Sequence, residues 1–269
     1  MDQESEIKAA IGAVEVRAVS TERAGGVKQS REVAREVPLT IEIKDVGVFT
    51  IMCTPCDTPA LAVGFAFSEG LLERREDILM LMKCPDDPNV IRMQLAQKKE
   101  AAGGERRLLI VSSCGMCGSE DLNKVIGSLP VVGDEIRINT EKLVELTARL
   151  KLEQKIFQRT GGTHAAALVR DGEILGLGED LGRHSAFDKA VGKCLLNGIE
   201  LKGMIGVMSG RVSFELAAKA ARAGVELIAA VSAPSSLALE AADRCNITLC
   251  GFVRGTEATV YTHPKRIAP

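Results

Sequence analysis

The sequence has no tryptophan, and aromatic residues make up only 3% of its 269 residues. Proteins that bind single-stranded nucleic acids stack the bases on aromatic side chains, so this composition argues against that class. The chain also lacks a basic excess, because 34 Lys and Arg stand against 36 Asp and Glu, for a net charge of −2. A general nucleic-acid-binding protein would show such an excess, so we expect no nucleic-acid partner.

Long hydrophobic runs are missing as well. No apolar stretch approaches the ~18 residues of a membrane span, and the acidic, polar start MDQESEIKAA is unlike a signal peptide. We therefore expect a cytoplasmic protein with no membrane partner. The eight cysteines should then be mostly reduced, and a CxxC pair in that compartment is more typical of metal binding or catalysis than of a structural disulfide.

The hydrophobic pattern predicts an α/β fold in two domains, with an α+β domain over residues 1–150 and a second domain over 151–269. Residues 1–30 show little apolar periodicity, and we expect them to be irregular. The first domain is expected to contain a strand hairpin, a helix and a strand, over residues 38–55, 58–72 and 89–96.

A helix is expected over residues 139–162, with Thr140 as its cap and the domain boundary in or next to it. From residue 163 onward, two strands around Asp171-Gly172 are followed by alternating helices and strands. This order predicts a largely parallel sheet covered on both faces, which is a three-layer α/β domain.

The stretch SSCGMCGSED places Cys114 and Cys117 between a strand-like run and a helix-like segment. Helical amides just after Cys117 would stabilise a thiolate and lower its pKa, whereas Glu120 and Asp121 oppose this if they face the sulfurs. The residues alone leave four uses open: a disulfide, a zinc site, a redox dithiol or a sulfur carrier.

A second pair, Cys53 and Cys56, also has CxxC spacing, and 57 residues separate it from Cys114. Zinc ribbons usually place about 12–20 residues between their pairs, so a four-cysteine zinc site is the weaker alternative. Buried packing is the expectation for five cysteines: Cys53, Cys84, Cys194, Cys245 and Cys250.

Polar residues follow three strands of the second half, at 178–189, 209–213 and 232–236. Ligands of open parallel sheets bind at the carboxyl ends of strands, where helix N-termini favour anions. The side chains suited to phosphate or pyrophosphate are Ser209, Arg211, Ser232, Ser235 and Ser236, with Gly210 between them and further charge from Arg183 and Arg254. We therefore predict an anionic ligand, and for each serine the alternative is simple helix capping.

The chain has three histidines. His164 follows Thr160-Gly-Gly-Thr and His184 follows Arg183, so each is a candidate for ligand contact or proton donation, and for each a histidine merely bonded to its neighbours is the alternative. His263 is expected to be solvated. No G-x-S-x-G motif is present to support a serine hydrolase.

Eight segments carry a resemblance to a known family: VPLTIEI, LAVGFAFSEGLL, SSCGMCG, TGGTHAAAL, GEDLGRHSAFDKAVG, SGRVSFELAAKAARAG, AAVSAPSSLA and GFVRGTEATVYT. On these motifs the chain resembles the formate dehydrogenase accessory family, FdhD/NarQ, from about Glu36 to Tyr261. The second domain of that family is similar to the cytidine deaminase fold. This chain has no H-x-E followed by P-C-x-x-C, so the deaminase zinc site is absent.

The resemblance implies a sulfurtransferase, with Cys114 as the persulfide cysteine and Cys117 as its partner. A cysteine desulfurase would supply sulfane sulfur, and the persulfide would sulfurate the molybdenum or tungsten bis-guanine-dinucleotide cofactor of formate dehydrogenase. The family's dinucleotide segment falls on Phe252, Val253, Arg254, Gly255, Thr256 and Glu257. Cys56 departs from the family, which is expected to have glycine there.

The predicted cofactor site adds seven residues to that segment: Ser209, Arg211, Ser232, Ser235, His164, Arg183 and His184. No resident metal is expected, because the molybdenum cofactor is the transferred ligand. A homodimer is expected, since a ligand with two guanines suits two copies of one site. Two rival hypotheses are a zinc-stabilised interaction protein that uses both CxxC pairs and a nucleotide-binding enzyme of deaminase-like fold.

Overall fold

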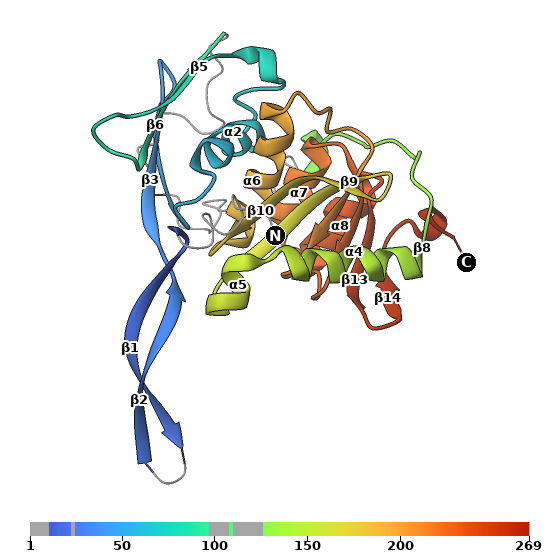
Figure 1. The fold of residues 1–269 in the computed structure, drawn as a ribbon. Coiled ribbons are helices and arrows are strands. Elements are labelled where there is room, and N and C mark those ends of the chain that lie inside the picture. Colours follow the sequence, from blue (N-terminus) through green and yellow to red (C-terminus); the bar gives the residue numbers. More distant parts are fainter. Residues whose placement is uncertain (1–10, 23–24, 97–107, 110–125, 269) are drawn as a thin grey trace.

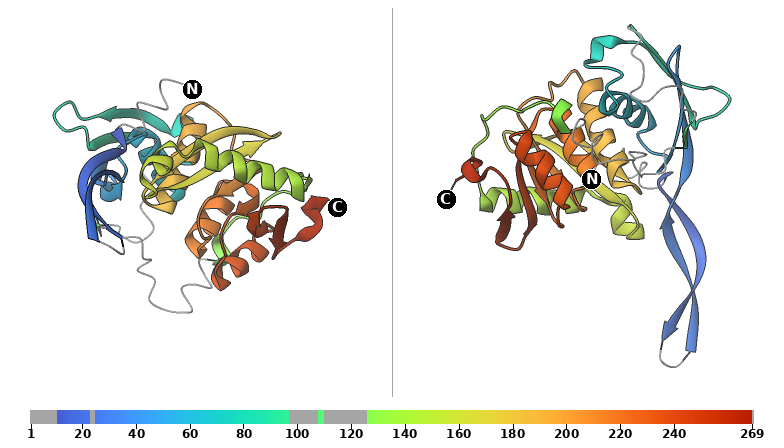
Figure 2. Two further views of the ribbon diagram at one scale, coloured as in Figure 1. Left: turned by 60° about the horizontal axis from the view of Figure 1, so that its bottom comes forward. Right: turned by 180° about the vertical axis from the view of Figure 1, so that it is seen from behind.

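The structure is a computed structural model that describes residues 11–22, 25–96, 108–109 and 126–268 (Figure 1). A five-stranded sheet lies in the first half of the chain and a six-stranded sheet in the second. Helices fill the space between the two sheets, as the views in Figures 1 and 2 show. The predicted α/β class is therefore confirmed.

The five-stranded sheet has the order β5-β6-β3-β4-β7. Its strands are β3 (Val37–Ile43), β4 (Gly47–Cys53), β5 (Ile78–Lys83), β6 (Val90–Leu95) and β7 (Leu108–Leu109). The expected hairpin is β3 and β4, and Asp45 takes a φ of 61° in its turn. Helix α2 (Thr58–Ser68) covers the inner face of this sheet, where Leu39 and Ile41 are fully buried. Gly70, at a φ of 74°, follows the helix and marks its end before the expected residue 72.

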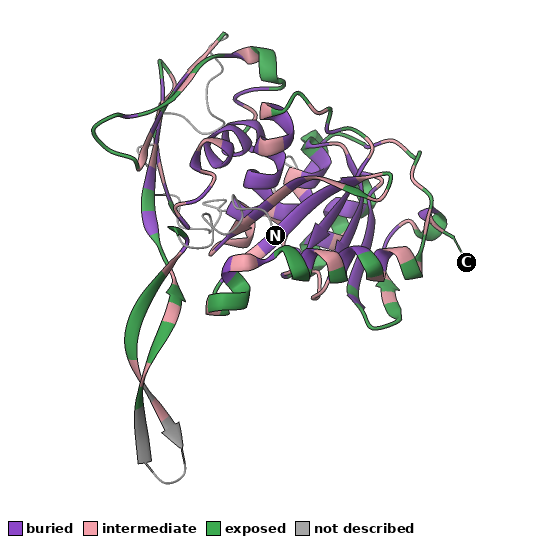
Figure 3. Cartoon of the chain, in the orientation of Figure 1, coloured by how far each residue is buried: buried purple, intermediate pink, exposed green. Residues whose placement is uncertain are grey.

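Strands β1 (Ala13–Glu22) and β2 (Gly25–Ala34) pair as an antiparallel ribbon that projects from the body of the molecule (Figures 1 and 3). The expectation that residues 1–30 are irregular is therefore wrong for the described part. Val14, Val16 and Val33 are all exposed on the ribbon. Because none of the ribbon side chains whose burial is described lies in a core, this part of the sequence shows no inward apolar pattern by which it could be recognised.

The six-stranded sheet has the order β10-β9-β11-β12-β13-β14. Its strands are β9 (His164–Arg170), β10 (Glu173–Asp180), β11 (Met204–Met208), β12 (Val225–Ala230), β13 (Thr248–Arg254) and β14 (Glu257–Val260). Only β11, β12 and β13 run parallel to one another, and the remaining pairs are antiparallel. The expectation of a largely parallel sheet is therefore wrong, because tight hairpins add β10 and β14 at the two edges.

Helices cover both faces of this sheet, so the expected three layers are confirmed (Figure 2). They are α4 (Thr140–Glu153), α6 (Arg183–Leu196), α7 (Phe214–Arg222) and α8 (Ser236–Arg244). Strand β9 divides its side chains between the layers: Ala166 and Leu168 face α6, while Ala165 and Ala167 share a cluster with α4. The likeness to the cytidine deaminase fold stays a prediction.

The helix expected over 139–162 is divided into α4 and α5 (Lys155–Thr160), with Gln154 between them. Its cap is Asn139, whose side chain accepts a hydrogen bond from Lys142 N, so the expectation of Thr140 was wrong by one residue. Short pieces complete the chain: η1 (Arg75–Asp77), β8 (Ile138–Asn139), η2 (Pro264–Arg266) and β15 (Ile267–Ala268). Helix α4 packs on the six-stranded sheet. The domain boundary near residue 150 stays a prediction.

Helices α2 and α6 cross in direct contact and join the two sheets into one core. A Cβ added at Gly64 would lie 1.8 Å from Asp188 O, and one added at Gly192 would lie 1.9 Å from Ala60 O. Only glycine fits at this crossing, which explains why both helices carry one in their interior despite its low helix propensity. In the described part of the chain, no helix is long and apolar enough to cross a membrane.

Candidate functional site

The parallel strands β11, β12 and β13 end side by side, and the predicted polar residues follow them. Val212 forms a bridge with Pro234 after β11 and β12, and Phe252 N donates to Ser232 O at 3.3 Å. The structure therefore brings Ser209, Arg211 and Ser232 to one edge of the sheet, as their positions in the sequence predicted.

His164 and Arg183 meet at this edge beside Gly210. A Cβ added at Gly210 would lie 3.0 Å from His164 Nδ1 and 3.8 Å from Arg183 Cβ. Ser209 Oγ accepts a hydrogen bond of 2.9 Å from Ala165 N, which fixes the loop against β9. Burial lowers the pKa of His164, and the cations Arg183 and Arg211 lower it further. The local charge is thus positive enough to oppose protonation of a histidine.

Arg183 begins α6, and its Nε atom is buried with no hydrogen-bond partner among the described residues. A buried guanidinium nitrogen without a partner is costly in an isolated protein. A phosphate or carboxylate oxygen in the adjacent loop would satisfy it and would add a charge-assisted hydrogen bond. This orphaned donor agrees with the predicted anionic ligand, which itself stays a prediction.

His184 lies next to Arg183 but its ring is held by α7. Its Nε2 atom is 3.0 Å from Ser213 Oγ and 3.1 Å from Glu215 Oε2. A catalytic triad needs the serine and the acid at different ring nitrogens, whereas here both meet Nε2. The His184 ring is therefore bonded to residues of its own fold, which agrees with the alternative that it is not a ligand contact.

A pH dependence of stability should follow from His184. Burial lowers its pKa from 6.5 to about 3, with added effects from Lys219 and Arg183. Between these two values the unfolded chain binds the proton and the folded chain does not, so stability falls as pH falls below about 6.5. From pH 7 to pH 5 the wild type should lose about 2 kcal/mol more than His184→Gln in urea unfolding. Parallel stability curves for the two proteins would contradict this assignment.

Three predicted serines follow β12, and they play different parts: Ser236 is the first residue of α8. Ser235 is the N-cap of α8, where its Oγ accepts from Ala238 N at 3.2 Å, so the capping alternative accounts for it. Ser232 is half-buried and holds Phe252 N through its carbonyl. Ser209 and Ser232 are therefore the serines that shape the edge itself.

The segment from Phe252 to Glu257 forms the tip of the hairpin between β13 and β14. Gly255 takes a φ of 62° in the turn, and Val253 is fully buried. The Arg254, Thr256 and Glu257 side chains are exposed, and Arg254 Cζ lies 5.8 Å from the centroid of the Phe252 ring. The hairpin thus extends the same edge from which the predicted anion site is built.

Cys114 and Cys117 lie outside the described residues. The chain enters their segment at Leu109, which pairs with Thr50 of β4, and the described chain resumes at Ile126. The expected strand over 108–111 is described only as β7.

A family model described as the FdhD/NarQ family matches residues 34–268, which is most of the chain. The chain belongs to the FdhD/NarQ family. Relatives named sulfur carrier protein FdhD agree: the Streptomyces coelicolor protein is 41% identical over 249 residues, covering 87% of this chain and 88% of its own. The Thermoplasma volcanium protein is 38% identical over 257 residues, which cover 90% of this chain and 91% of its own.

A solved structure of a formate dehydrogenase accessory protein from Desulfotalea psychrophila has the same fold. It superposes with a TM-score of 0.76 at 22% identity, covering 95% of this chain and 99% of that one. At 22% identity, this similarity establishes the fold of this FdhD/NarQ chain and nothing more.

A buried ion pair in this FdhD/NarQ chain was missed by the sequence analysis. Lys189 Nζ lies 2.6 Å from Asp180 Oδ2, and neither side chain is exposed. The ammonium also donates to Thr54 O and Glu179 O, both at 3.0 Å, and Asp180 Oδ2 accepts from Thr54 N at 3.1 Å. Burial alone would lower the pKa of Lys189, but Asp180 raises it above its usual range. One signal was available, since Lys189 stands among the apolar residues of an otherwise buried helix.

The second CxxC of the FdhD/NarQ chain lies against this pair. Burial raises the pKa of Cys56 and raises that of Cys53 to about 12. Cys56 Sγ is 3.6 Å from the Lys189 ammonium, whose charge would repel a zinc ion. Within the described ranges no group of three or more His, Cys, Asp and Glu could hold a metal ion. Like Cys53, the other cysteines expected to be packed are buried, namely Cys84, Cys194, Cys245 and Cys250.

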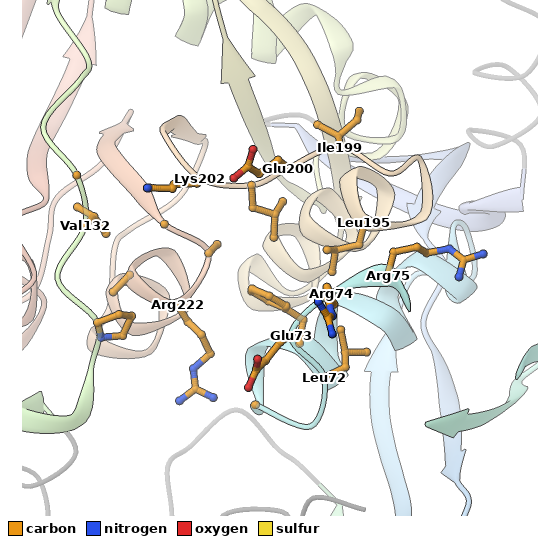
Figure 4. Close-up of a pocket in the computed structure, with 18 of the residues that line it drawn as sticks. Leu72, Glu73, Arg74, Arg75, Val132, Leu195, Ile199, Glu200, Lys202 and Arg222 are labelled. Carbon is orange, nitrogen blue, oxygen red and sulfur yellow. The ribbon is translucent and has the colours of Figure 1, made fainter. Parts of the chain in front are cut away.

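A cavity of about 770 Å³ lies at the opposite, amino-terminal end of the parallel strands (Figure 4). The C-terminal ends of α2, α6 and α7 reach it, and its rim carries four cations: Arg74, Arg75, Lys202 and Arg222. Arg222 lies in the last turn of α7, where a cation stabilises the helix C-terminus. None of the predicted site residues that the structure describes lines this cavity.

Proposed function

We propose that this chain is a cytoplasmic sulfur carrier that accepts sulfane sulfur from a cysteine desulfurase and delivers it to the molybdenum bis-guanine-dinucleotide cofactor for formate dehydrogenase. The relatives named sulfur carrier protein FdhD support the carrier role. The accessory protein with the same fold supports the link to formate dehydrogenase. The proposal treats the cofactor as cargo, whether its metal is molybdenum or tungsten.

The single observation that carries the ligand half of the proposal is the orphaned Nε of Arg183. It lies at the edge where Arg211 and Ser209 follow β11, beside His164. A dinucleotide cofactor carries pyrophosphates, and these need buried or half-buried cations and helix N-termini of this kind. The hairpin tip from Phe252 to Glu257 would contact the nucleoside end.

The proposed sulfur transfer follows thiol–disulfide exchange. The Cys114 thiolate attacks the outer sulfur of the desulfurase persulfide, the donor's S–S bond breaks, and the donor leaves as a thiolate. Two fates of the Cys114 persulfide are chemically balanced. Cys117 attacks the inner sulfur of Cys114, which releases the outer sulfur as hydrosulfide and leaves a disulfide, or Cys117 only stabilises the persulfide until the cofactor takes its outer sulfur.

The experiment that tests the carrier role is the intact mass of the protein after incubation with a cysteine desulfurase and cysteine. Wild type should gain the mass of one sulfur atom, and a thiol reductant should remove it. Cys114→Ala should gain nothing. Cys56→Ala, which removes one thiol of the buried pair, should gain sulfur like the wild type.

Two results would overturn the carrier proposal. One is a wild type that gains no sulfur. The other is a Cys114→Ala protein that gains as much as the wild type. Bound zinc at one equivalent per chain, together with the first result, would favour the zinc-stabilised interaction protein that uses both CxxC pairs.

The proposal includes a homodimer. The β1–β2 ribbon projects from the body, and a two-stranded ribbon is marginally stable in isolation. The exposed Val14, Val16 and Val33 side chains on it offer apolar surface for a second copy. Light scattering of the full chain measures this directly, and a monomeric mass would contradict it.

A further inference from the structure

The cavity at the amino-terminal end of the parallel strands is a groove that the proposed cofactor site does not use (Figure 4). Its volume of about 770 Å³ is large enough to receive side chains from a second molecule. Buried apolar residues line its floor, namely Leu72, Leu195, Leu201, Ala221 and Ala223. A floor of this kind favours an occupant that brings apolar groups of its own.

The groove exists because three helices end at it with a glycine. Gly70, Gly198 and Gly224 come shortly after α2, α6 and α7, with φ values of 74°, 68° and 69°. A glycine in this left-handed conformation ends the helix and turns the chain away. The backbone caps the last carbonyls itself, since Gly198 N donates to Leu195 O at 3.0 Å and Gly224 N donates to Ala221 O at 2.9 Å. These helix ends therefore need no hydrogen-bond donor from the side chains at the rim.

Three of the four cations at the rim have no counter-ion among the described residues. Arg74 is paired with Asp77 at 3.6 Å, whereas Arg75, Lys202 and Arg222 form no ion pair with any residue that the structure describes. Carboxylates also line the groove, and they belong to Glu73, Glu76 and Glu200. Because the three cations are not paired with these acids, they are available to carboxylates of another molecule.

The Arg222 side chain extends across the groove from α7 toward the end of α2. A Cβ added at Gly70 would lie 2.6 Å from Arg222 Nη1, and Arg222 is exposed. Figure 4 shows Arg222 and Lys202 on one side of the groove, toward Val132, and Arg75 on the other. The unpaired positive charges therefore flank the apolar floor.

The wall at Val132 belongs to the chain that returns from the predicted carrier cysteines. Residues 118–125 separate Cys117 from Ile126, where the described chain resumes, and residues 128 and 130–133 line the groove. Val131 is 69% exposed, more than any other large apolar side chain whose burial is described. It continues the apolar floor to the surface, and a continuous apolar surface of this kind marks an interaction site.

We propose that this groove docks the protein that donates sulfur, through an acidic segment of the donor that also carries an apolar side chain. The carboxylates of that segment would meet Arg222, Lys202 and Arg75, and its apolar side chain would pack on Val131 and the floor. This inference rests on the proposed function, in which a cysteine desulfurase is the donor, and it gives the donor a place on this chain. A donor held there is next to the point at which the chain returns from Cys117.

The test compares two sulfur donors. The full-length protein is mixed with a cysteine desulfurase and cysteine, or with glutathione persulfide, and intact mass follows the rate of sulfur gain. The double variant Lys202→Glu with Arg222→Glu should raise the desulfurase concentration that gives half the maximal rate about tenfold or more, because rim charges act on association. Its maximal rate and its rate with glutathione persulfide should match the wild type, because the small donor has no segment to dock. Added salt should slow transfer from the desulfurase to the wild type more than to the variant.

Three further variants separate docking from folding. Lys151→Glu makes the same charge change on α4, on the other face of the six-stranded sheet, and should leave both rates unchanged. Lys202→Glu alone leaves the end of α7 intact and should show a smaller effect of the same kind as the double variant. Val131→Asp keeps both cations but interrupts the apolar surface, so it should also raise the half-maximal desulfurase concentration and leave the rate with glutathione persulfide unchanged.

The outcomes distinguish this inference from the function on which it rests. Equal half-maximal concentrations in the wild type and the double variant overturn the docking groove and leave the carrier proposal standing. A wild type that gains sulfur from neither donor overturns both. A double variant that loses sulfur gain from both donors alike also overturns the groove, since that result indicates damage to the carrier itself.

Discussion

Replacing Lys189 with methionine should destabilise the protein by about 3–5 kcal/mol, because it leaves the Asp180 carboxylate buried without its cation. Asp180 is fully buried and lies 2.6 Å from the ammonium. The substitution also removes the hydrogen bonds to Thr54 O and Glu179 O, which tie the end of β4 to the end of β10. Urea unfolding followed by circular dichroism measures the loss.

Two comparisons make this test specific. Lys142→Met breaks a surface pair with Glu145 in which both side chains are more than 40% exposed, and it should change stability by less than about 1 kcal/mol. The double variant Asp180→Asn with Lys189→Met should recover part of the loss, since no charge is then left unpaired. If Lys189→Met had the same free energy of unfolding as Lys142→Met, the buried Lys189–Asp180 pair would not contribute to holding the two sheets together.

Alanine at Gly192 should destabilise the protein by about 1–3 kcal/mol through overpacking. Its Cβ would lie 1.9 Å from Ala60 O and 2.9 Å from Gly64 N, so the backbones of α2 and α6 must move apart. This loss should appear although alanine is favoured over glycine in a helix by about 1 kcal/mol. The free energy of unfolding in urea measures the net effect.

The control for this crossing is Gly127→Ala. Among the described residues, an added Cβ there meets nothing nearer than Arg244 Nη2 at 3.4 Å, and Gly127 is exposed. Its stability should therefore match or slightly exceed that of the wild type. If Gly192→Ala left the free energy of unfolding unchanged as well, α2 and α6 would be packed less closely than the structure shows.

Both expected losses concern the same joint, which lies between the two halves of the proposed carrier. Thr54, Lys189 and the two glycines connect the sheet that leads to Cys114 with the sheet whose edge gathers Arg183 and Arg211. Variants at this joint should therefore be tested for sulfur gain and for nucleotide binding separately.

The order of elements from β9 to β13 was predictable because each has its own periodicity. Strand β11 is buried at every residue, and α7 has its buried residues at helical spacing. Strand direction was predicted less well, because a buried strand reads alike in parallel and antiparallel surroundings. The ribbon of β1 and β2 was missed for the opposite reason, since none of its side chains whose burial the structure describes is buried.

The residues of the candidate site were predicted unevenly. Ser209, Arg211 and Arg183 follow strands or open a helix, so their convergence at one sheet edge could be expected from topology alone. Ser235 is a helix cap in the structure, and His184 is bonded to α7. The sequence offered no means of separating these cases, because a serine or histidine after a strand looks the same whether it faces a ligand or its own helix.

The amino-acid sequence by itself determined the α/β class, the family and the set of polar residues at strand ends, because these depend on local periodicity and on motifs that are contiguous in the chain. Only the tertiary structure decided which distant groups meet. Lys189 reaches Thr54 across 135 positions, and the β-bulge at Phe252 exists only because β14 returns along β13. Such contacts depend on sheet order and register, which long-range packing fixes and no local pattern encodes.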